Sequence, residues 1–157
     1  AEQNRIPAGL FALPNETQTR VLEQGDGILE LVHCGFRELG RFDAKYRRRF
    51  ELHQAGLTIL DSMNQCDIRD HLLWSFHLAP GLKAKVSPEG VDILDAASCR
   101  LCTVIPPLEA KGDTLPFSHS PSYGVKQEAS VLLFRHQPTR EFRPGPADFL
   151  FHVRWHT

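Results

Sequence analysis

Alternation of apolar and polar side chains along residues 45–81 is the sequence feature that most constrains the fold. Side chains of a β-strand point to opposite faces in turn. In the run 45–53, Tyr46 and Arg48 therefore share one face and Arg47 lies on the other. Two further runs of the same kind follow after short breaks, at 57–63 and 71–79. The pattern predicts a half-buried antiparallel sheet with one charged face.

Strand-like runs continue almost to the end of the chain, and no comparable run has helical periodicity. The predicted strands are 19–24, 28–35, 45–53, 57–63, 71–79, 82–87, 91–94, 100–105, 130–136 and 148–155. Glycine and proline punctuate these runs with turn chemistry. Many short strands spaced in this way are typical of a sandwich or a barrel. We expect an all-β protein, an antiparallel β-sandwich of about ten strands with little or no helix.

The expected organisation is one β-sandwich domain over residues 1–157, in which 1–18 form an irregular N-terminal arm. The weakly patterned segment 106–127 is rich in Pro, Ser and Gly. It is expected to be a surface loop or a strand at the edge of a sheet. The only methionine is Met63, so the chain is interpreted as a processed product or a piece of a longer protein.

Charge and hydropathy exclude two classes of partner. The chain has 18 basic and 19 acidic residues and a formal net charge of −1, which removes the bulk electrostatic argument for nucleic acid or a membrane surface. No run approaches the roughly 20 apolar residues of a membrane helix, and the first residues resemble no secretory signal. One local basic stretch has two interpretations, an anionic-ligand site or a solvated sheet face: Arg37, Arg41, Lys45, Arg47, Arg48 and Arg49.

The four cysteines, Cys34, Cys66, Cys99 and Cys102, do not establish disulfides, and the redox compartment stays open. Cys99 and Cys102 have Cys-x-x-Cys spacing, but no second pair exists. Positions three apart on a strand also face opposite ways. We interpret the thiols as structural or incidental.

Histidines are the residues most suited to acid/base chemistry or metal binding near neutral pH. Of the eight, His33, His71 and His77 lie in or beside strand runs where a side chain can face a cleft. His33 precedes a glycine at the end of a strand; its alternative interpretation is a partly buried imidazole bonded to backbone. Neighbouring strands can also combine His33 or Cys34 with Asp61 or His71 into a metal site. Signatures of serine hydrolases, nucleotide-binding loops and zincins are absent.

Five short motifs, in order, resemble the C-terminal β-sandwich region of heparinase II/III-like polysaccharide lyases, over roughly residues 20–135. They are His33-Cys34-Gly35-Phe36, Tyr46-Arg47-Arg48-Arg49-Phe50-Glu51-Leu52, Leu60-Asp61, Phe76-His77-Leu78-Ala79-Pro80-Gly81 and Ser120-Pro121-Ser122-Tyr123-Gly124. Three positions depart from the family's pattern. Cys34 stands where Asp is expected, and Tyr46 and Ala79 stand where His is common.

The resemblance implies β-elimination on a uronic-acid polysaccharide, which needs a base, an acid and neutralisation of the uronate carboxylate. The family's N-terminal α/α-toroid supplies most of this chemistry, so the isolated chain is expected to be inactive and to have the toroid and an anionic polysaccharide as partners. His33 is the implied catalytic residue. The implied substrate-binding residues are Arg47, Arg49 and His77. The implied ligands of a divalent metal such as zinc are His33, Asp61 and His71.

Two rival functions remain open. The first is a non-enzymatic carbohydrate-binding module that uses the Arg47 and Arg49 face, and the second is a purely structural interaction domain. A binding module predicts affinity that falls with salt and survives loss of His33. A structural domain predicts no sugar binding. The bacterial compartment, periplasm or cytoplasm, is undetermined.

Overall fold

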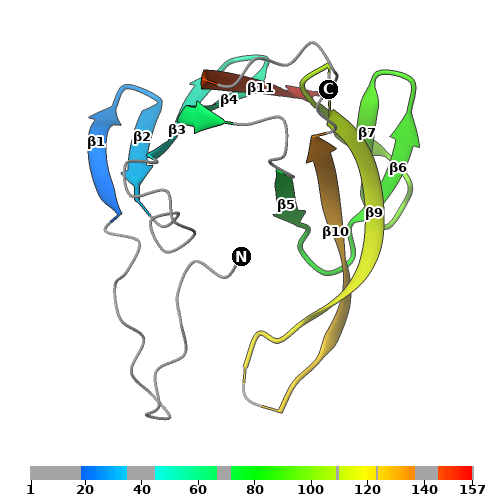
Figure 1. The fold of residues 1–157 in the computed structure, drawn as a ribbon. Coiled ribbons are helices and arrows are strands. Elements are labelled where there is room, and N and C mark those ends of the chain that lie inside the picture. Colours follow the sequence, from blue (N-terminus) through cyan, green and yellow to red (C-terminus); the bar gives the residue numbers. More distant parts are fainter. Residues whose placement is uncertain are drawn as a thin grey trace.

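The computed structural model describes residues 19–34, 45–66, 72–108, 110–122, 124–136 and 145–156. These residues form an all-β structure of eleven strands in two antiparallel sheets, with no helix in the part described (Figure 1). The predicted fold class is therefore confirmed. None of the described residues forms a helix of the length and apolarity needed to cross a membrane.

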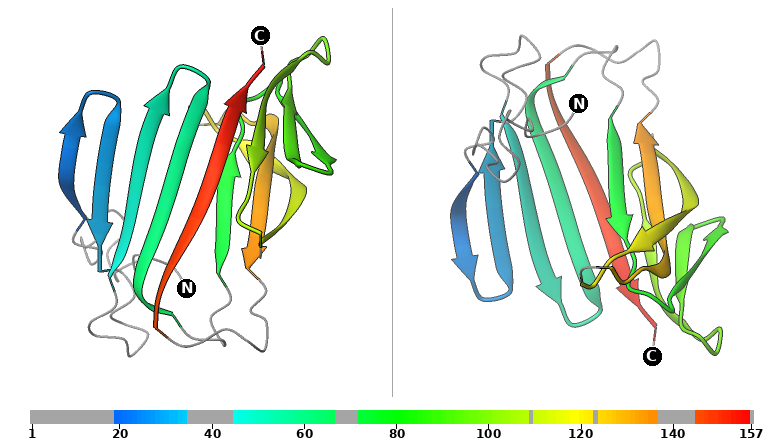
Figure 2. Two further views of the ribbon diagram at one scale, coloured as in Figure 1. Left: turned by 90° about the horizontal axis from the view of Figure 1, so that it is seen from above. Right: turned by 90° about the horizontal axis from the view of Figure 1, so that it is seen from below.

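The larger sheet has eight strands and the smaller sheet has three. In spatial order, the larger sheet contains β1 (Arg20–Gly25), β2 (Ile28–His33), β3 (Tyr46–His53), β4 (Gly56–Cys66), β11 (Gly145–Trp155), β8 (Arg100–Ile105), β7 (Gly90–Leu94) and β6 (Lys83–Ser87). The smaller sheet contains β5 (Leu73–His77), β10 (Gln127–His136) and β9 (Ala110–His119). The C-terminal strand β11 lies between β4 and β8, in the middle of the larger sheet (Figure 2).

A tight turn between β1 and β2 and a close backbone approach between β4 and β11 fix the register of the larger sheet at two places. Asp26 and Gly27 join β1 to β2 with φ angles of 48° and 78°, the left-handed backbone that a two-residue hairpin turn requires. Gly56 opens β4 against β11, and a Cβ atom there would lie 2.1 Å from the carbonyl oxygen of Val153. Only glycine permits this approach, which fixes where the pairing of β11 with β4 ends, at Arg154 opposite Gly56.

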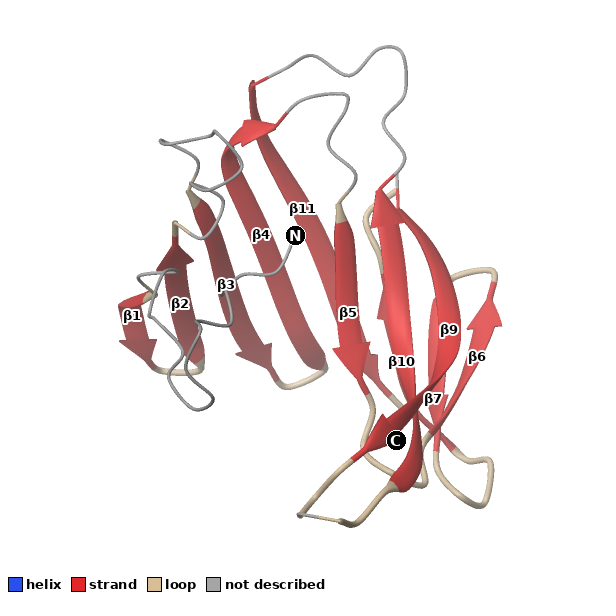
Figure 3. Cartoon of the chain, turned by 60° about the horizontal axis from the view of Figure 1, so that its bottom comes forward, coloured by secondary structure: helices blue, strands red, loops and turns tan. Residues whose placement is uncertain are grey.

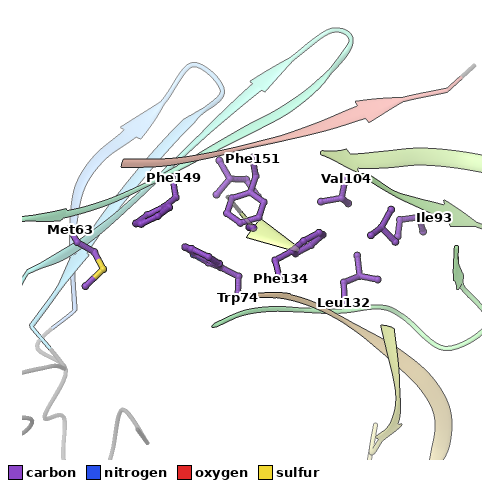
Figure 4. Packing of buried hydrophobic residues seen from close by; sticks show 11 residues of the cluster. Met63, Trp74, Ile93, Val104, Leu132, Phe134, Phe149 and Phe151 are labelled. Atoms are coloured by element: carbon purple, nitrogen blue, oxygen red, sulfur yellow. The ribbon is translucent and has the colours of Figure 1, made fainter. Parts of the chain in front are cut away.

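The core lies between the two sheets and is built from alternate residues of the central strands (Figure 4). Phe151 of β11 is 0% exposed, and its ring centroid lies 5.3 Å from that of Trp74 and 5.5 Å from that of Phe134. Phe149 lies 4.9 Å from Trp74. Tilted and edge-on contacts of this kind add to the stability that burial of the rings provides.

The segment predicted as a surface loop or an edge strand contains β9, which is an edge strand of the smaller sheet. Pro116 lies within it, opposite Ser130. Proline has no amide hydrogen to donate. An inner strand is hydrogen-bonded on both sides, whereas an edge strand has one side without a partner strand, so an edge position suits proline. The loop alternative is wrong for the ten residues of β9.

The smaller sheet lies over one half of the larger one. β5, β10 and β9 lie beside the half that contains β11 to β6, and β1, β2 and β3 extend beyond β5 (Figure 3). Apolar residues at inward positions of these outlying strands are accordingly more exposed, Val21 at 55% and Leu52 at 60%. The inner face of β2 to β4 is thus where polar side chains can lie beside the core.

Candidate functional site

Four polar side chains gather on the inner face of β2, β3 and β4, next to β5. His33 is paired across the strands with Tyr46, and Arg48 is paired with Asp61. All four belong to the same alternating series as the core residues of their strands, which is why they face inward. We call His33, Tyr46, Arg48 and Asp61 the inner cluster.

Arg48 and Asp61 form a two-point ion pair. Nε and Nη2 of Arg48 donate hydrogen bonds of 2.6 Å each to Oδ1 and Oδ2 of Asp61. The Asp61 side chain is 0% exposed and that of Arg48 is 29% exposed. Burial is the largest single influence and opposes the charge of Arg48, but the interactions with Asp61 and Tyr46 together outweigh it and raise the pKa of Arg48. The Arg48 guanidinium is therefore permanently charged.

Tyr46 connects this ion pair to the second sheet. Its hydroxyl accepts a 3.0 Å hydrogen bond from Nη2 of Arg48. Burial is the main cause that raises the pKa of Tyr46, and the charge of Asp61 and a hydrogen bond to Asp61 act in the same direction. The charge of Arg48 and, to a smaller extent, a hydrogen bond with Trp74 of β5 act in the opposite direction. Tyr46 is consequently a neutral phenol that can hold neighbours in place but is a poor base.

His33 lies against the ring of Tyr46, with centroids 4.9 Å apart and ring planes inclined at 38°. Its pKa is lowered, first by burial and then by the charge of Arg48, and Asp61 partly offsets this. The imidazole is therefore neutral at physiological pH, and a neutral imidazole can accept a proton.

The inner cluster thus combines a proton acceptor with a fixed cation. Nη1 of Arg48 makes no hydrogen bond or ion pair with the residues that the structure describes. An arginine held by two of its nitrogens keeps the third available for an oxygen ligand. Such an arrangement can bind a carboxylate or a sulfate group beside His33.

The predicted substrate-binding residues Arg47 and Arg49 lie on the opposite, outer face of β3. Arg49 pairs with Glu23, Glu30 and Glu51 at N···O distances of 2.5, 2.8 and 2.6 Å, which raises the pKa of Arg49. Arg47 lies 3.2 Å from Glu30. We call these five residues the outer cluster. Its two arginines face three carboxylates, so an anionic ligand has to compete with glutamates already in place.

His77 is also separated from the inner cluster. It is an exposed residue of β5 that alternates with Trp74 and Phe76, and its ring lies 4.6 Å from that of Phe117. Because Trp74 faces the core, His77 faces the other side of the smaller sheet. The predicted substrate-binding residues Arg47, Arg49 and His77 therefore do not lie on the sheet face that carries His33. Their role in binding stays a prediction.

Several residues named from the sequence lie outside the residues that the structure describes, so the roles predicted for them are not tested. These are the arm 1–18, Gly35, Phe36, Arg37, Arg41, His71 and Tyr123.

The predicted zinc ligands are only partly described, since His71 is not among the described residues. Within the described ranges, no three His, Cys, Asp or Glu side chains are grouped so that they can hold a metal ion. Both carboxylate oxygens of Asp61 already accept hydrogen bonds from Arg48. The described residues of the set therefore do not fit a metal ion well.

The described cysteines Cys34, Cys99 and Cys102 are free thiols. Burial, with a smaller contribution from Asp92, raises the pKa of Cys102. A raised pKa disfavours the thiolate, which is the reactive form, so Cys102 does not have the character of a redox or metal-binding thiol. This agrees with its interpretation as a structural residue.

The sequence named Arg48 only as part of the basic stretch, and predicted neither Arg48 nor Tyr46 as a residue of the site. The signal was present, because Arg48 shares its face with Tyr46 and Phe50, both partly buried. A charged residue at an inward position of a strand needs a buried partner. Asp61, at an inward position of the next strand, supplies it.

No protein-family model matches this chain, and no curated protein matches it in sequence. Among solved structures, the chain is similar to the crystal structure of a mutant of heparan sulfate lyase HepC from Pedobacter heparinus, with a TM-score of 0.61 and 11% sequence identity. The match covers 88% of this chain and 22% of that one, so the chain spans about a fifth of that enzyme's length. The chain therefore shares its β-sandwich fold with one part of a heparan sulfate lyase.

Proposed function

We propose that this chain is the C-terminal β-sandwich domain of a heparinase II/III-like polysaccharide lyase and forms one wall of the cleft for a uronic-acid polysaccharide. The inner cluster carries the proposal. A neutral His33 lies beside the fixed cation of Arg48, on a fold that is also found in a heparan sulfate lyase. The motif order in the sequence supports the same family.

The chemistry of β-elimination assigns a role to each group. A base removes the proton at C5 of the uronate, the electrons form the C4–C5 double bond, and the bond from C4 to the leaving sugar's oxygen breaks. His33 contributes as the proton-accepting imidazole. Nη1 of Arg48, which is not used by Asp61, donates a hydrogen bond to the carboxylate next to C5, where negative charge develops. The leaving oxygen takes its proton from an acid supplied by the rest of the protein.

A domain that supplies only some of the groups needed for β-elimination is expected to bind the polysaccharide without cleaving it. The α/α-toroid of the same protein is the proposed partner that completes the cleft. The difference in length between this chain and the heparan sulfate lyase agrees with a domain of a larger protein. Incubating the chain with heparan sulfate and following the ultraviolet absorbance of the unsaturated product should therefore show no turnover.

Binding is the property that tests the proposal in the isolated chain. We suggest titration calorimetry with size-defined heparan sulfate oligosaccharides on the wild type, His33→Ala and Arg47→Met. His33 lies in the inner cluster and Arg47 in the outer cluster, and their positions are only one strand apart. We expect binding to weaken at least several-fold in His33→Ala and to persist in Arg47→Met.

The rival functions give different results. A carbohydrate-binding module that uses the outer face would keep its affinity in His33→Ala and lose it in Arg47→Met. A structural domain would bind none of the oligosaccharides in any of the three forms. Either result would contradict the proposal, and so would efficient cleavage by the chain alone.

A further inference from the structure

The inner cluster contains a permanent cation of its own. Both oxygens of Asp61 are bound by the Arg48 guanidinium, at 2.6 Å from Nε and 2.6 Å from Nη2. This fork uses one lone pair on each oxygen in the geometry that arginine and carboxylate prefer. The Asp61 side chain is 0% exposed, so its negative charge is balanced inside the protein and not by solvent.

A divalent metal ion at the same carboxylate would meet two obstacles. Zinc binds carboxylate oxygens at about 2.0–2.2 Å, closer than the guanidinium nitrogens, and would stand next to the positive charge of Arg48. It would also bring two positive charges to a carboxylate that has one negative charge already neutralised. Arg48 would have to leave, and its Nη2 would then lose its bonds to Asp61 and to Tyr46.

Arg48 also links neighbouring strands, as a structural metal ion often does. It connects β3 to β4 through Asp61, and through the Tyr46 hydroxyl it belongs to a network that reaches Trp74 of the smaller sheet. We propose that the Arg48 guanidinium is the built-in counter-ion of the inner cluster, in place of a divalent metal ion, so that the cluster forms and stays ordered without metal. This inference does not depend on the lyase proposal, because it concerns only how the cluster is held together.

The test compares the wild-type chain with His33→Gln, which removes a predicted metal ligand and leaves the Arg48–Asp61 pair intact. Each protein is dialysed against EDTA and then supplied with zinc sulfate, and the thermal unfolding midpoint is recorded at each step. Bound zinc is measured by elemental mass spectrometry on the same samples. We expect chelation to leave the midpoints of both proteins unchanged, and the midpoint and zinc content of the two proteins to respond alike to zinc.

The opposite pattern would overturn the proposal. If the wild type lost stability on chelation and regained it with zinc, and His33→Gln showed neither change, the cluster would be a metal site. If chelation leaves the midpoints of both proteins unchanged, the proposal is supported; a large loss that is equal in both proteins would also contradict it, because Asp61 could then bind zinc without His33. A ligand that stabilises only the folded state raises the midpoint according to its affinity and concentration, so the comparison is quantitative.

Discussion

Arg48 and Arg49 are neighbours on β3, and yet they lie in opposite environments. Arg48 faces the core and binds one carboxylate that is fully buried. Arg49 faces outward and shares its charge among Glu23, Glu30 and Glu51, of which Glu23 is half exposed. The two residues have the same chemistry, and the alternation of the strand alone separates them. The arginines themselves are similarly exposed, 29% for Arg48 and 24% for Arg49, so the difference lies in their partners: Asp61 is fully buried, whereas Glu23 and Glu51 are 50% and 36% exposed.

This difference concerns energy as well as position. Losing one partner of a buried ion pair leaves an uncompensated charge in the protein, whereas losing one partner of an exposed pair leaves a charge that water solvates. Substitutions on the inner face should therefore cost far more stability than substitutions of the same type on the outer face. The predictions below test this contrast, from the largest expected effect to the smallest.

The largest contrast is expected on β11, between Phe151 and Leu150. Phe151 is 0% exposed and Leu150 is 41% exposed, on opposite faces of the strand. Phe151→Ala should lower the free energy of unfolding by about 3–5 kcal/mol, because it opens a cavity between the sheets. Leu150→Ala should cost less than about 1 kcal/mol. Urea unfolding of both variants measures the difference, and equal losses would mean that the faces are wrongly assigned.

The ion pair gives the next contrast. Arg48→Met should destabilise the chain by about 3 kcal/mol, near the lower end for a broken buried pair because Arg48 is partly exposed. Arg47→Met, with a side chain that is 57% exposed, should cost at most about 1 kcal/mol. Urea unfolding at constant pH and salt provides the comparison. Similar losses of unfolding free energy in the two variants would show that the buried charge of Asp61 does not need Arg48 as its partner.

A double-mutant cycle sharpens this prediction. In Arg48→Met/Asp61→Leu, both charges are removed, and no buried charge is left unpaired. The double variant should therefore be more stable than the sum of the two single effects predicts, with a coupling free energy of about 1–3 kcal/mol. Additive effects would indicate that the two residues act independently.

A smaller effect is expected from pH. The pKa of His33 is lower in the folded chain than in the unfolded chain, where it is about 6.5. Between the two pKa values the unfolded state binds more protons, so stability should fall as pH decreases through this window. The groups that face His33 from the neighbouring strands are Tyr46, Arg48 and Asp61. His33→Gln should reduce the pH dependence of urea unfolding there; an unchanged slope would exclude His33 as its source.

The smallest effect should come from the outer cluster. Arg49→Met removes a cation from three carboxylates, and their mutual repulsion should appear mainly at low salt. We expect a small fall in the thermal midpoint that added sodium chloride reverses. Arg48→Met, measured in parallel, should stay destabilised at high salt because its partner is buried. A loss in Arg49→Met that salt leaves unchanged would contradict the distinction between the two clusters.

Periodicity in the sequence predicted much of the fold because strand alternation is a local property. The two faces of β3 and the turn at Asp26 and Gly27 could both be predicted from neighbouring residues. The strand β9 was harder to predict, because Pro116 and small polar residues weaken its pattern. Only its pairing with β10 makes it a strand.

The site was predicted less well because it depends on which strands become neighbours. His33 and Asp61 were named from the sequence, but the bond between Asp61 and Arg48 depends on the register of β3 against β4. The ion pairs of Arg47 and Arg49 with Glu23 and Glu30 likewise depend on the neighbouring strands β1 and β2. The basic run in the sequence resembled an anionic-ligand site because two of the carboxylates that accompany it, Glu23 and Glu30, are distant along the chain.

The imidazole of His33 gives the most direct test that the inner cluster is the ligand site. Its NMR signals can be assigned by comparison with His33→Gln and followed during titration with heparan sulfate oligosaccharides. The account predicts that the His33 signals shift in a saturable manner, whereas those of His53 on the outer face do not move. Shifts confined to His53, with His33 unchanged, would contradict it.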